Sequence, residues 1–162
     1  MDFGAGRVFP PLFVENYLRL VHSAALNNFE NVRAYSIDLG FLVGTENSTM
    51  IQAHVESVMK VGEPFQKAGL YDFGVSTIVE GVYNLAPTML QHRLKPPPPE
   101  VYSLHRKLAG CYLLCIKLKA HVNAHQMFFD IYSKFDFIED TADYSNTAES
   151  FSLENISPSS SS

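Results

Sequence analysis

Apolar residues recur at three- and four-residue intervals over most of the chain, the spacing of amphipathic helices. The pair Pro10–Pro11 suits the first turn of a helix, where a missing N–H is tolerated, and this helix is expected to reach about Asn27. Asn28 is a suitable N-cap for a second helix, which Gly40 would end. A third helix is expected to end near Gly62.

Glycine and proline residues interrupt the helical pattern in the middle of the chain. The glycines of residues 67–74 predict a loop, and Ser76 is a good cap for a fourth helix. Pro87 is expected to kink or split that helix near Leu85. The run Pro96–Pro99 cannot be helical and predicts an extended connector of polyproline type. It is either a rigid spacer between helices or a ligand of SH3 or WW domains, and the helical patterns on both sides favour the spacer.

A long helix is expected after the prolines, with Glu100 in its first turn. Cys111 and Cys115 lie four residues apart in its apolar run, which places both on one face and indicates reduced core thiols rather than a disulfide framework. A final helix covers about residues 124–134. Because no alternating strand pattern of useful length occurs, the prediction is an all-α fold of about six helices, arranged as a bundle or an orthogonal array.

Composition and charge change this picture at one end of the chain. The 162 residues, 46% hydrophobic and 18% charged, are about one domain with room for a core. The acidic excess behind the net charge of -5 lies in residues 136–162, which hold six acids, eight serines and no Lys or Arg and predict a disordered tail. Residues 1–135 carry 11 acidic and 12 basic side chains. The body is therefore nearly neutral, which argues against a nucleic-acid partner.

Targeting and membrane features are not visible in the sequence. The first residues lack the regions of a signal peptide and the Arg-rich, acid-poor composition of a transit peptide. No apolar run approaches the roughly 18 to 20 residues of a membrane span. We therefore expect no targeting segment and no transmembrane helix in this sequence.

Two copies of one triplet are the first candidates for chemistry. Asp2-Phe3-Gly4 and Asp72-Phe73-Gly74 match the triplet that carries a magnesium-binding aspartate in protein kinases. Three residues are a weak signal, and both copies cannot be the metal site. The surrounding sequence has to decide between them.

The remaining patterns have simpler interpretations. His105-Arg106-Lys107 resembles the start of a kinase catalytic loop, but lysine stands where the catalytic aspartate belongs, so a helix face with capping or paired side chains is favoured. His121 and His125 would share a zinc ion only if the last helix began early, and no acid or thiol stands at a suitable offset, so surface histidines are favoured. The sequence has no Gly-x-Ser-x-Gly motif and no glycine-rich phosphate loop with a lysine.

A set of short motifs follows one order through residues 2–135. They are Asp2-Phe3-Gly4-Ala5 with Arg7, Arg33-Ala34 with Ser36-Ile37, Phe41-Leu42 with Gly44, Ala53-His54, Gly62-Glu63 with Phe65, Asp72-Phe73-Gly74, His92-Arg93-Leu94 with Pro96–Pro98, Tyr102-Ser103-Leu104-His105-Arg106-Lys107 with Gly110, and Lys117-Leu118-Lys119-Ala120. In this order and spacing they resemble the C-terminal lobe of the aarF-domain, or UbiB, atypical kinase-like family. The likeness is greatest to the mitochondrial members that support coenzyme Q synthesis.

The resemblance implies the helical C-lobe of a protein-kinase-like fold over residues 1–135, followed by the tail. It assigns Asp2 as the magnesium ligand and, through the metal, as a cofactor-binding residue, whereas Asp72 has no metal role. Magnesium and ATP are the cofactors of the family. The family's catalytic loop, strand lysine and alanine-rich nucleotide loop lie upstream of this motif and have no match here. We therefore expect no catalytic residue, no stable cofactor binding and no ATPase activity from this chain alone.

The resemblance also sets the expected function and location. It implies an ATP-dependent atypical kinase that supports ubiquinone synthesis at the matrix side of the mitochondrial inner membrane, of which this chain would be a shortened product or fragment. The implied partners are the missing N-lobe or coenzyme Q biosynthesis proteins, and a membrane lipid or a polyprenyl quinone is a candidate ligand. Two alternatives stay open: an interaction module without catalysis, and a lipid-binding helical bundle.

Overall fold

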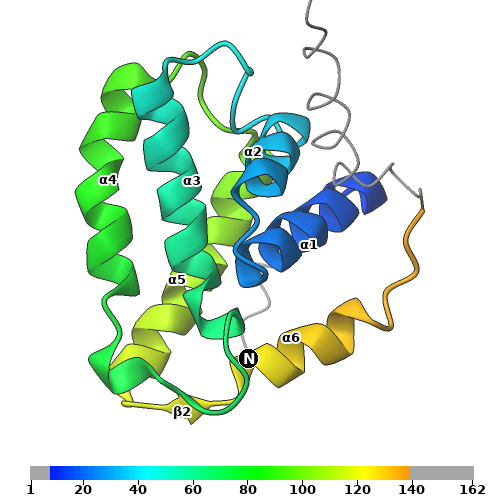
Figure 1. Cartoon of the computed structure of the whole chain (residues 1–162), viewed down its shortest axis with the longest axis vertical. Coiled ribbons are helices and arrows are strands. Elements are labelled where there is room, and N and C mark those ends of the chain that lie inside the picture. Colours follow the sequence, from blue (N-terminus) through cyan, green and yellow to red (C-terminus); the bar gives the residue numbers. More distant parts are fainter. Residues whose placement is uncertain (1–7, 139–162) are drawn as a thin grey trace, which may run out of the picture.

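The computed structural model describes residues 8–138, which form a helical fold with one pair of short strands (Figure 1). The helices are α1 (Pro11–Ala25), α2 (Phe29–Asp38), α3 (Ser48–Gly62), α4 (Ile78–His92), α5 (Pro99–Lys117) and α6 (Ala124–Tyr132). The 3-10 helices are η1 (Glu63–Phe65) and η2 (Phe73–Val75), and the strands are β1 (Tyr71–Asp72) and β2 (His121–Val122). The predicted α-helical fold class is confirmed.

The first helices begin and end where the sequence indicated. α1 starts at Pro11, in the position that tolerates a proline. The side chain of Asn28 caps α2 by accepting a hydrogen bond of 3.0 Å from the Asn31 amide. Gly40 follows α2 with a φ of +75°, a left-handed conformation that favours glycine. Local capping therefore fixes the bounds of α1 and α2 as predicted.

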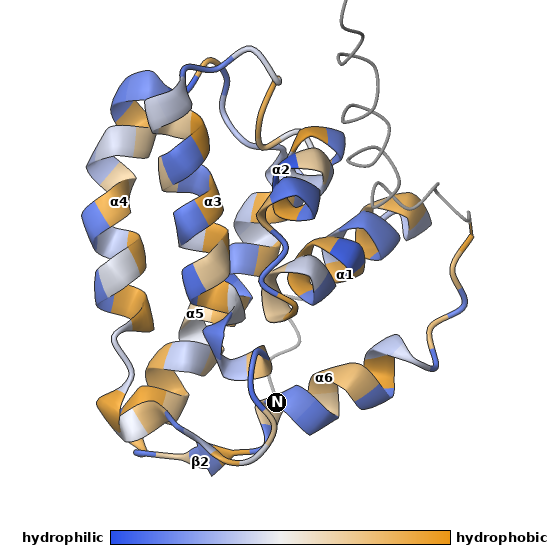
Figure 2. Cartoon of the chain, in the orientation of Figure 1, coloured by the Kyte–Doolittle hydropathy of each residue, from blue (hydrophilic) through white to orange (hydrophobic). Residues whose placement is uncertain are grey.

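The main core lies between α1, α2 and α3. Its buried residues are Leu20, Ala24, Val32, Tyr35, Leu39, Val55 and Met59. Figure 2 shows hydrophobic and hydrophilic residues interleaved along these helices, as the three- and four-residue spacing requires. The end of α3 lies directly on α1, because a Cβ atom built on Gly62 would stand 2.6 Å from the Cβ of Ala24. The glycine therefore permits the close approach of the two helices.

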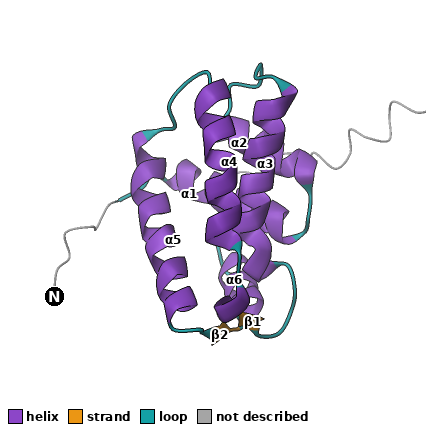
Figure 3. Ribbon diagram, turned by 90° about the vertical axis from the view of Figure 1, so that its left-hand side faces the viewer, coloured by secondary structure: helices purple, strands orange, loops and turns teal. Residues whose placement is uncertain are grey.

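A second, smaller core lies beside the paired strands, at one end of the molecule (Figure 3). Its buried residues are Phe73, Ile78 and Tyr112. The antiparallel register pairs Tyr71 with Val122 and Asp72 with His121. The predicted loop over residues 67–74 therefore contains a strand and the start of a 3-10 turn. Strands of two residues are too short to show the alternation that predicts β-structure.

Pro87 does not split α4. The helix is continuous from Ile78 to His92, so the predicted break near Leu85 is wrong. A proline removes one helical hydrogen bond, here to the carbonyl of Tyr83. Both residues are exposed, so that carbonyl remains accessible to water and the helix continues on the packing of its other side.

The proline run connects α4 to α5, as the spacer interpretation predicts. Pro98 has extended dihedral angles of -57° and 149° and stands at the N-cap of α5. Pro99 is the first residue of the helix, so the expectation that all four prolines are non-helical is wrong at this position. The first amides of a helix have no intrahelical partner, so a proline is tolerated there. Glu100 lies in the first turn as expected.

The two cysteines are free thiols with different surroundings. Cys115 is half-buried and packs against the second core, whereas Cys111 is exposed. The prediction of two core thiols is therefore wrong for Cys111. The physical reason is that, within residues 8–138, few elements pack against α5, and the helix buries Val101 and Tyr112 alone.

The last described residues lie against α1. The Ile138 amide donates a hydrogen bond of 2.7 Å to Oε2 of Glu15, and the Arg19 guanidinium lies 4.5 Å from the ring centroid of Phe137. Arg19 in turn donates to Oε1 of the fully buried Glu15. The remainder of the predicted tail, residues 139–162, lies outside the described residues. Within residues 8–138, no helix has the length and apolar character that crossing a membrane requires.

Candidate functional site

Asp2, the residue assigned to magnesium and nucleotide, lies outside the described residues, so its role stays a prediction. Within residues 8–138, no group of three or more His, Cys, Asp or Glu side chains is placed to hold a metal ion. The other residues singled out in the sequence lie in the described part of the chain.

Asp72, in the second copy of the triplet, stabilises a turn. Its Oδ1 accepts a hydrogen bond of 2.7 Å from the Gly74 amide and caps η2. Its Oδ2 lies 3.5 Å from Nε2 of His121 on the paired strand. These contacts give the carboxylate a structural role that involves no metal.

His121 and His125 have separate partners. His121 lies on β2 and faces Asp72, whereas His125 lies on α6. Nδ1 of His125 is 2.6 Å from the carbonyl oxygen of Phe65, so this nitrogen carries the proton that it donates. The structure does not join the two rings in a shared site.

The residues His105, Arg106 and Lys107 form part of α5 and not a loop. The ring of His105 turns toward the aromatic rings of Phe41 and Tyr17, at centroid distances of 5.5 and 6.1 Å. Arg106 and Lys107 are exposed. These residues therefore lie on a helix as predicted, whereas the expected capping or pairing by their side chains stays a prediction.

A buried polar pair joins α2 to α3. Nε2 of His54 lies 3.0 Å from Oγ of Ser36, and both side chains are buried. The Ser36 hydroxyl donates a hydrogen bond of 2.6 Å to the Val32 carbonyl, so His54 has to donate from Nε2. A serine whose proton is held by a carbonyl, and which is fully buried, is not an activated nucleophile. The pair satisfies polar groups inside the fold.

The surroundings of His54 keep its ring neutral. Burial, together with the nearby His105, lowers the pKa of His54 to about 4, and Glu46 opposes the shift. The carboxylate of Glu46 accepts hydrogen bonds from the amides of Val43 and Gly44, at 2.6 and 2.8 Å. It therefore holds the loop between α2 and α3.

A cleft of about 570 Å³ opens between α1, α3, α4 and α5, a size typical of small-molecule sites. Figure 3 shows α4 and α5, which form two of its walls. Apolar side chains make up most of its lining. They include Leu20, Val58, Ile78, Val82, Met89 and Leu108.

The charged residues of the cleft stand close together in the sequence. Arg93 follows the last residue of α4, and Lys95 lies in the connector to α5. Both side chains are exposed, and none of the described residues that line the cleft is Asp or Glu. Neither cation makes an ion pair with another residue of the described range 8–138. The cleft therefore combines apolar walls with a mouth of uncompensated positive charge.

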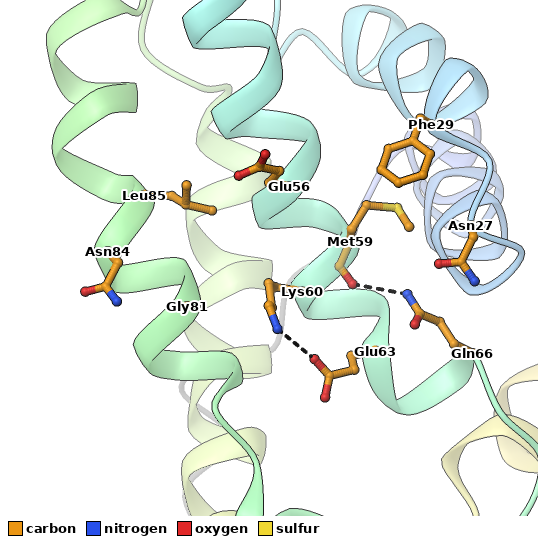
Figure 4. A pocket seen from close by; sticks show the side chains of 10 residues that line it. All are labelled: Asn27, Phe29, Glu56, Met59, Lys60, Glu63, Gln66, Gly81, Asn84 and Leu85. Atoms are coloured by element: carbon orange, nitrogen blue, oxygen red, sulfur yellow. Dashed lines mark hydrogen bonds and ion pairs between the residues drawn. The ribbon is translucent and has the colours of Figure 1, made fainter.

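A second groove, of about 440 Å³, is lined by residues of α3, α4 and the turn between α1 and α2 (Figure 4). Nζ of Lys60 lies 3.2 Å from Oε2 of Glu63, and Nε2 of Gln66 donates to the Met59 carbonyl at 3.5 Å. The aliphatic stem of Lys60 lies over Gly81, where a Cβ atom would be 3.2 Å from its Cδ. Because these polar groups already form an ion pair and a hydrogen bond within the protein, the groove is a weaker candidate for ligand binding than the apolar cleft.

Apart from the residues that line the cleft, α5 and its C-cap Leu118 carry four large apolar side chains that are each more than half exposed. We call this set the outer side of α5; it consists of Tyr102, Leu113, Leu114 and Leu118. Large apolar side chains gathered on one exposed helix mark a surface suited to a protein partner.

Sequence reasoning did not find the cleft or the pair of Ser36 and His54. Both depend on how helices far apart in the sequence are placed, and periodicity does not give that placement. One signal was present in the sequence, because α5 carries apolar residues on more of its surface than a single buried face requires.

Comparison with known proteins places these features in a family. A scan against models of protein families finds no match. The chain is 46% identical over 135 residues to the mitochondrial atypical kinase COQ8B of Danio rerio, covering 83% of this chain and 22% of that protein. It is 44% identical over 143 residues to the mitochondrial atypical kinase coq-8 of Caenorhabditis elegans, covering 88% and 19% of the two chains. It is 38% identical over 135 residues to the mitochondrial atypical kinase COQ8 of Saccharomyces cerevisiae, covering 82% of this chain and 27% of that protein.

The chain thus spans about a fifth to a quarter of the length of the curated relatives that it matches. The match nevertheless includes most of this chain, in relatives from fish, worm and yeast, and it agrees with the ordered motifs of residues 2–135. The chain belongs to the COQ8/UbiB family of atypical kinases, through the C-terminal region that it shares with these proteins.

Proposed function

We propose that this chain forms the C-terminal helical lobe of a mitochondrial atypical kinase that supports coenzyme Q synthesis. The observation that carries the proposal is the identity of 38 to 46% to COQ8 proteins over about 135 residues. The names of these relatives favour a mitochondrial location, and the family resemblance favours the matrix side of the inner membrane.

ATP and magnesium are the cofactors that this role implies. The described residues do not themselves fit a magnesium–nucleotide complex, because residues 8–138 hold no metal-ligating cluster and the cleft is apolar. In the proposal Asp2 is the one magnesium ligand from this chain, and the remaining groups come from the rest of the kinase. Phosphoryl transfer depends on several charged groups positioned together, so the chain alone is proposed to be inactive.

The outer side of α5 is the proposed contact with the rest of the kinase. The relatives are about four to five times as long as the matched region, so most of a family member lies outside it. Burying Leu113, Leu114 and Leu118 against another part of the protein would remove apolar surface from water. The exposed apolar residues of α5 support a contact of this kind.

A chimera tests this proposal. The matched region of S. cerevisiae COQ8 would be replaced by the corresponding residues of this chain and expressed in yeast that lacks its own COQ8. We expect the chimera to restore coenzyme Q, measured by chromatography of lipid extracts. An Asp2→Ala chimera should restore none, whereas the matched control Asp72→Asn should retain most of the activity, because Asp72 only caps a turn.

Two results would contradict the proposal. The first is a chimera that accumulates to the normal level, seen by immunoblot, but produces no coenzyme Q. The second is equal coenzyme Q with and without Asp2→Ala, which would remove the metal role of this residue.

The second candidate function is a helical binding module without catalysis. The observation that favours it is the apolar cleft between α1, α3, α4 and α5, which the kinase role does not use.

A further inference from the structure

We propose that the cleft between α1, α3, α4 and α5 binds one long-chain fatty carboxylate, with the acyl chain inside and the carboxylate at Arg93 and Lys95. This inference does not rest on the kinase role, because the cleft belongs entirely to the described residues of this chain.

The interior of the cleft suits a hydrocarbon chain. Most of its lining is apolar, and two of its polar side chains already have partners: His54 is uncharged at pH 7 and donates to Ser36, and the Tyr112 hydroxyl donates to the Val61 carbonyl at 2.6 Å. A ligand with polar groups along its whole length would find few partners for them there and would lose hydrogen bonds to water. A hydrocarbon chain has no hydrogen bonds to water that it would lose on entering the cleft.

The mouth of the cleft suits an anionic head group. Among the described residues, Arg93 and Lys95 are the only Arg or Lys that line the cleft, and they are two positions apart at the α4–α5 connection. Within residues 8–138 no acidic side chain lines the cleft and no ion pair already occupies either cation. A carboxylate placed there would gain charge-assisted hydrogen bonds while staying partly in water.

The size of the cleft favours a single chain. A volume of about 570 Å³ lies in the middle of the range for small-molecule sites, roughly 300 to 1,000 Å³. A lipid with two acyl chains carries twice the hydrocarbon behind one head group. We therefore commit to a fatty acid rather than a membrane phospholipid.

Titration calorimetry on the full 162-residue chain tests the inference, with each fatty acid kept below its critical micelle concentration. We expect palmitate to bind saturably to one site. Laurate, four methylenes shorter, should bind on the order of a hundredfold more weakly, because each buried methylene strengthens binding about fourfold. Methyl palmitate, which lacks the charge, should bind about tenfold more weakly than palmitate.

A matched pair of variants isolates the mouth of the cleft. Arg93→Gln with Lys95→Gln should weaken palmitate binding about tenfold and leave methyl palmitate unchanged. Arg106→Gln with Lys107→Gln removes the same two charges from exposed positions of α5 that do not line the cleft, and it should change binding less than twofold. All four positions are exposed, so the variants should keep the circular dichroism spectrum of the parent chain.

Three outcomes would overturn the inference. The first is the absence of saturable palmitate binding, which would indicate that a protein segment occupies the cleft. The second is equal affinity of the chain for palmitate and laurate. The third is equal affinity of the two double variants for palmitate. None of these results bears on the coenzyme Q test of the chimera, so the two proposals fail separately.

Discussion

At the scale of single residues, the buried His54 makes the stability of the fold depend on pH. Its pKa is about 4 in the folded chain and about 6.5 when exposed, so the unfolded state binds more protons between these values. The free energy of unfolding should therefore fall as the pH is lowered from 6.5 toward 4. The contribution of this one residue to the fall, down to pH 4.5, is roughly 2 to 3 kcal/mol.

A His54→Gln variant separates this residue from the other titrating groups. Glutamine places an amide where His54 has Nε2, so it retains a donor for Ser36 but does not titrate. Urea denaturation at pH 7 and at pH 4.5 should show a smaller loss of stability in the variant than in the parent chain. His22, whose pKa burial also lowers, is present in both proteins and cancels. An equal loss in both proteins would show that His54 is not the sensitive group.

Two glycine substitutions should have opposite effects on stability. Gly62→Ala puts a methyl group 2.6 Å from the Cβ of Ala24 and should destabilise the chain by about 1 to 3 kcal/mol, because α1 and α3 have to separate. Gly110→Ala meets no atom within 4 Å in the middle of α5 and should stabilise by roughly 0.5 to 1 kcal/mol. Chemical denaturation measures both changes. If Gly62→Ala were neutral, the close crossing of α1 and α3 would be wrong.

At the scale of the elements, α5 is distinguished by its exposed apolar side chains. Its outer side exposes Tyr102, Leu113, Leu114 and Leu118, so the chain alone should self-associate at micromolar concentration. Leu114→Lys with Leu118→Lys should shift the chain toward a monomer, measured by light scattering coupled to size-exclusion chromatography. The matched control Arg106→Lys with Lys107→Arg keeps the charge of the same helix and should associate like the parent. A parent chain that is already a monodisperse monomer would contradict the expectation.

The elements were predictable where local chemistry determines them. Asn28 and Gly40 mark the two ends of α2, as predicted, because capping and a left-handed turn depend only on neighbouring residues. Pro87 gave the wrong expectation because packing holds α4 together across one missing hydrogen bond. Pro99 also gave a wrong expectation, because a proline is acceptable at the first position of a helix. Cys111 was placed in the core on its spacing, but burial depends on neighbours that α5 lacks.

The functional residues were predictable to a smaller extent. Ordered motifs identified the family, and the comparisons confirm it. The motifs also singled out Asp2, whose role lies outside the described residues and stays a prediction. The cleft and its two cations could not be read from the sequence, because they form only when α1, α3, α4 and α5 are placed together.

At the scale of the whole molecule, residues 8–138 provide a helical scaffold, a cleft and a helix with exposed apolar side chains. These residues contain no cluster of metal-ligating side chains of the kind that nucleotide chemistry requires. In the proposed function, catalysis therefore depends on groups from other parts of a kinase.

The most direct test is the hydrolysis of labelled ATP by the purified chain with magnesium, beside an Asp2→Ala variant and a buffer control. We expect the chain and the variant both to stay at the level of the buffer, because one carboxylate does not position a phosphoryl group. Turnover above the buffer that disappears on Asp2→Ala would contradict it, because the chain would then hold a complete active site of its own.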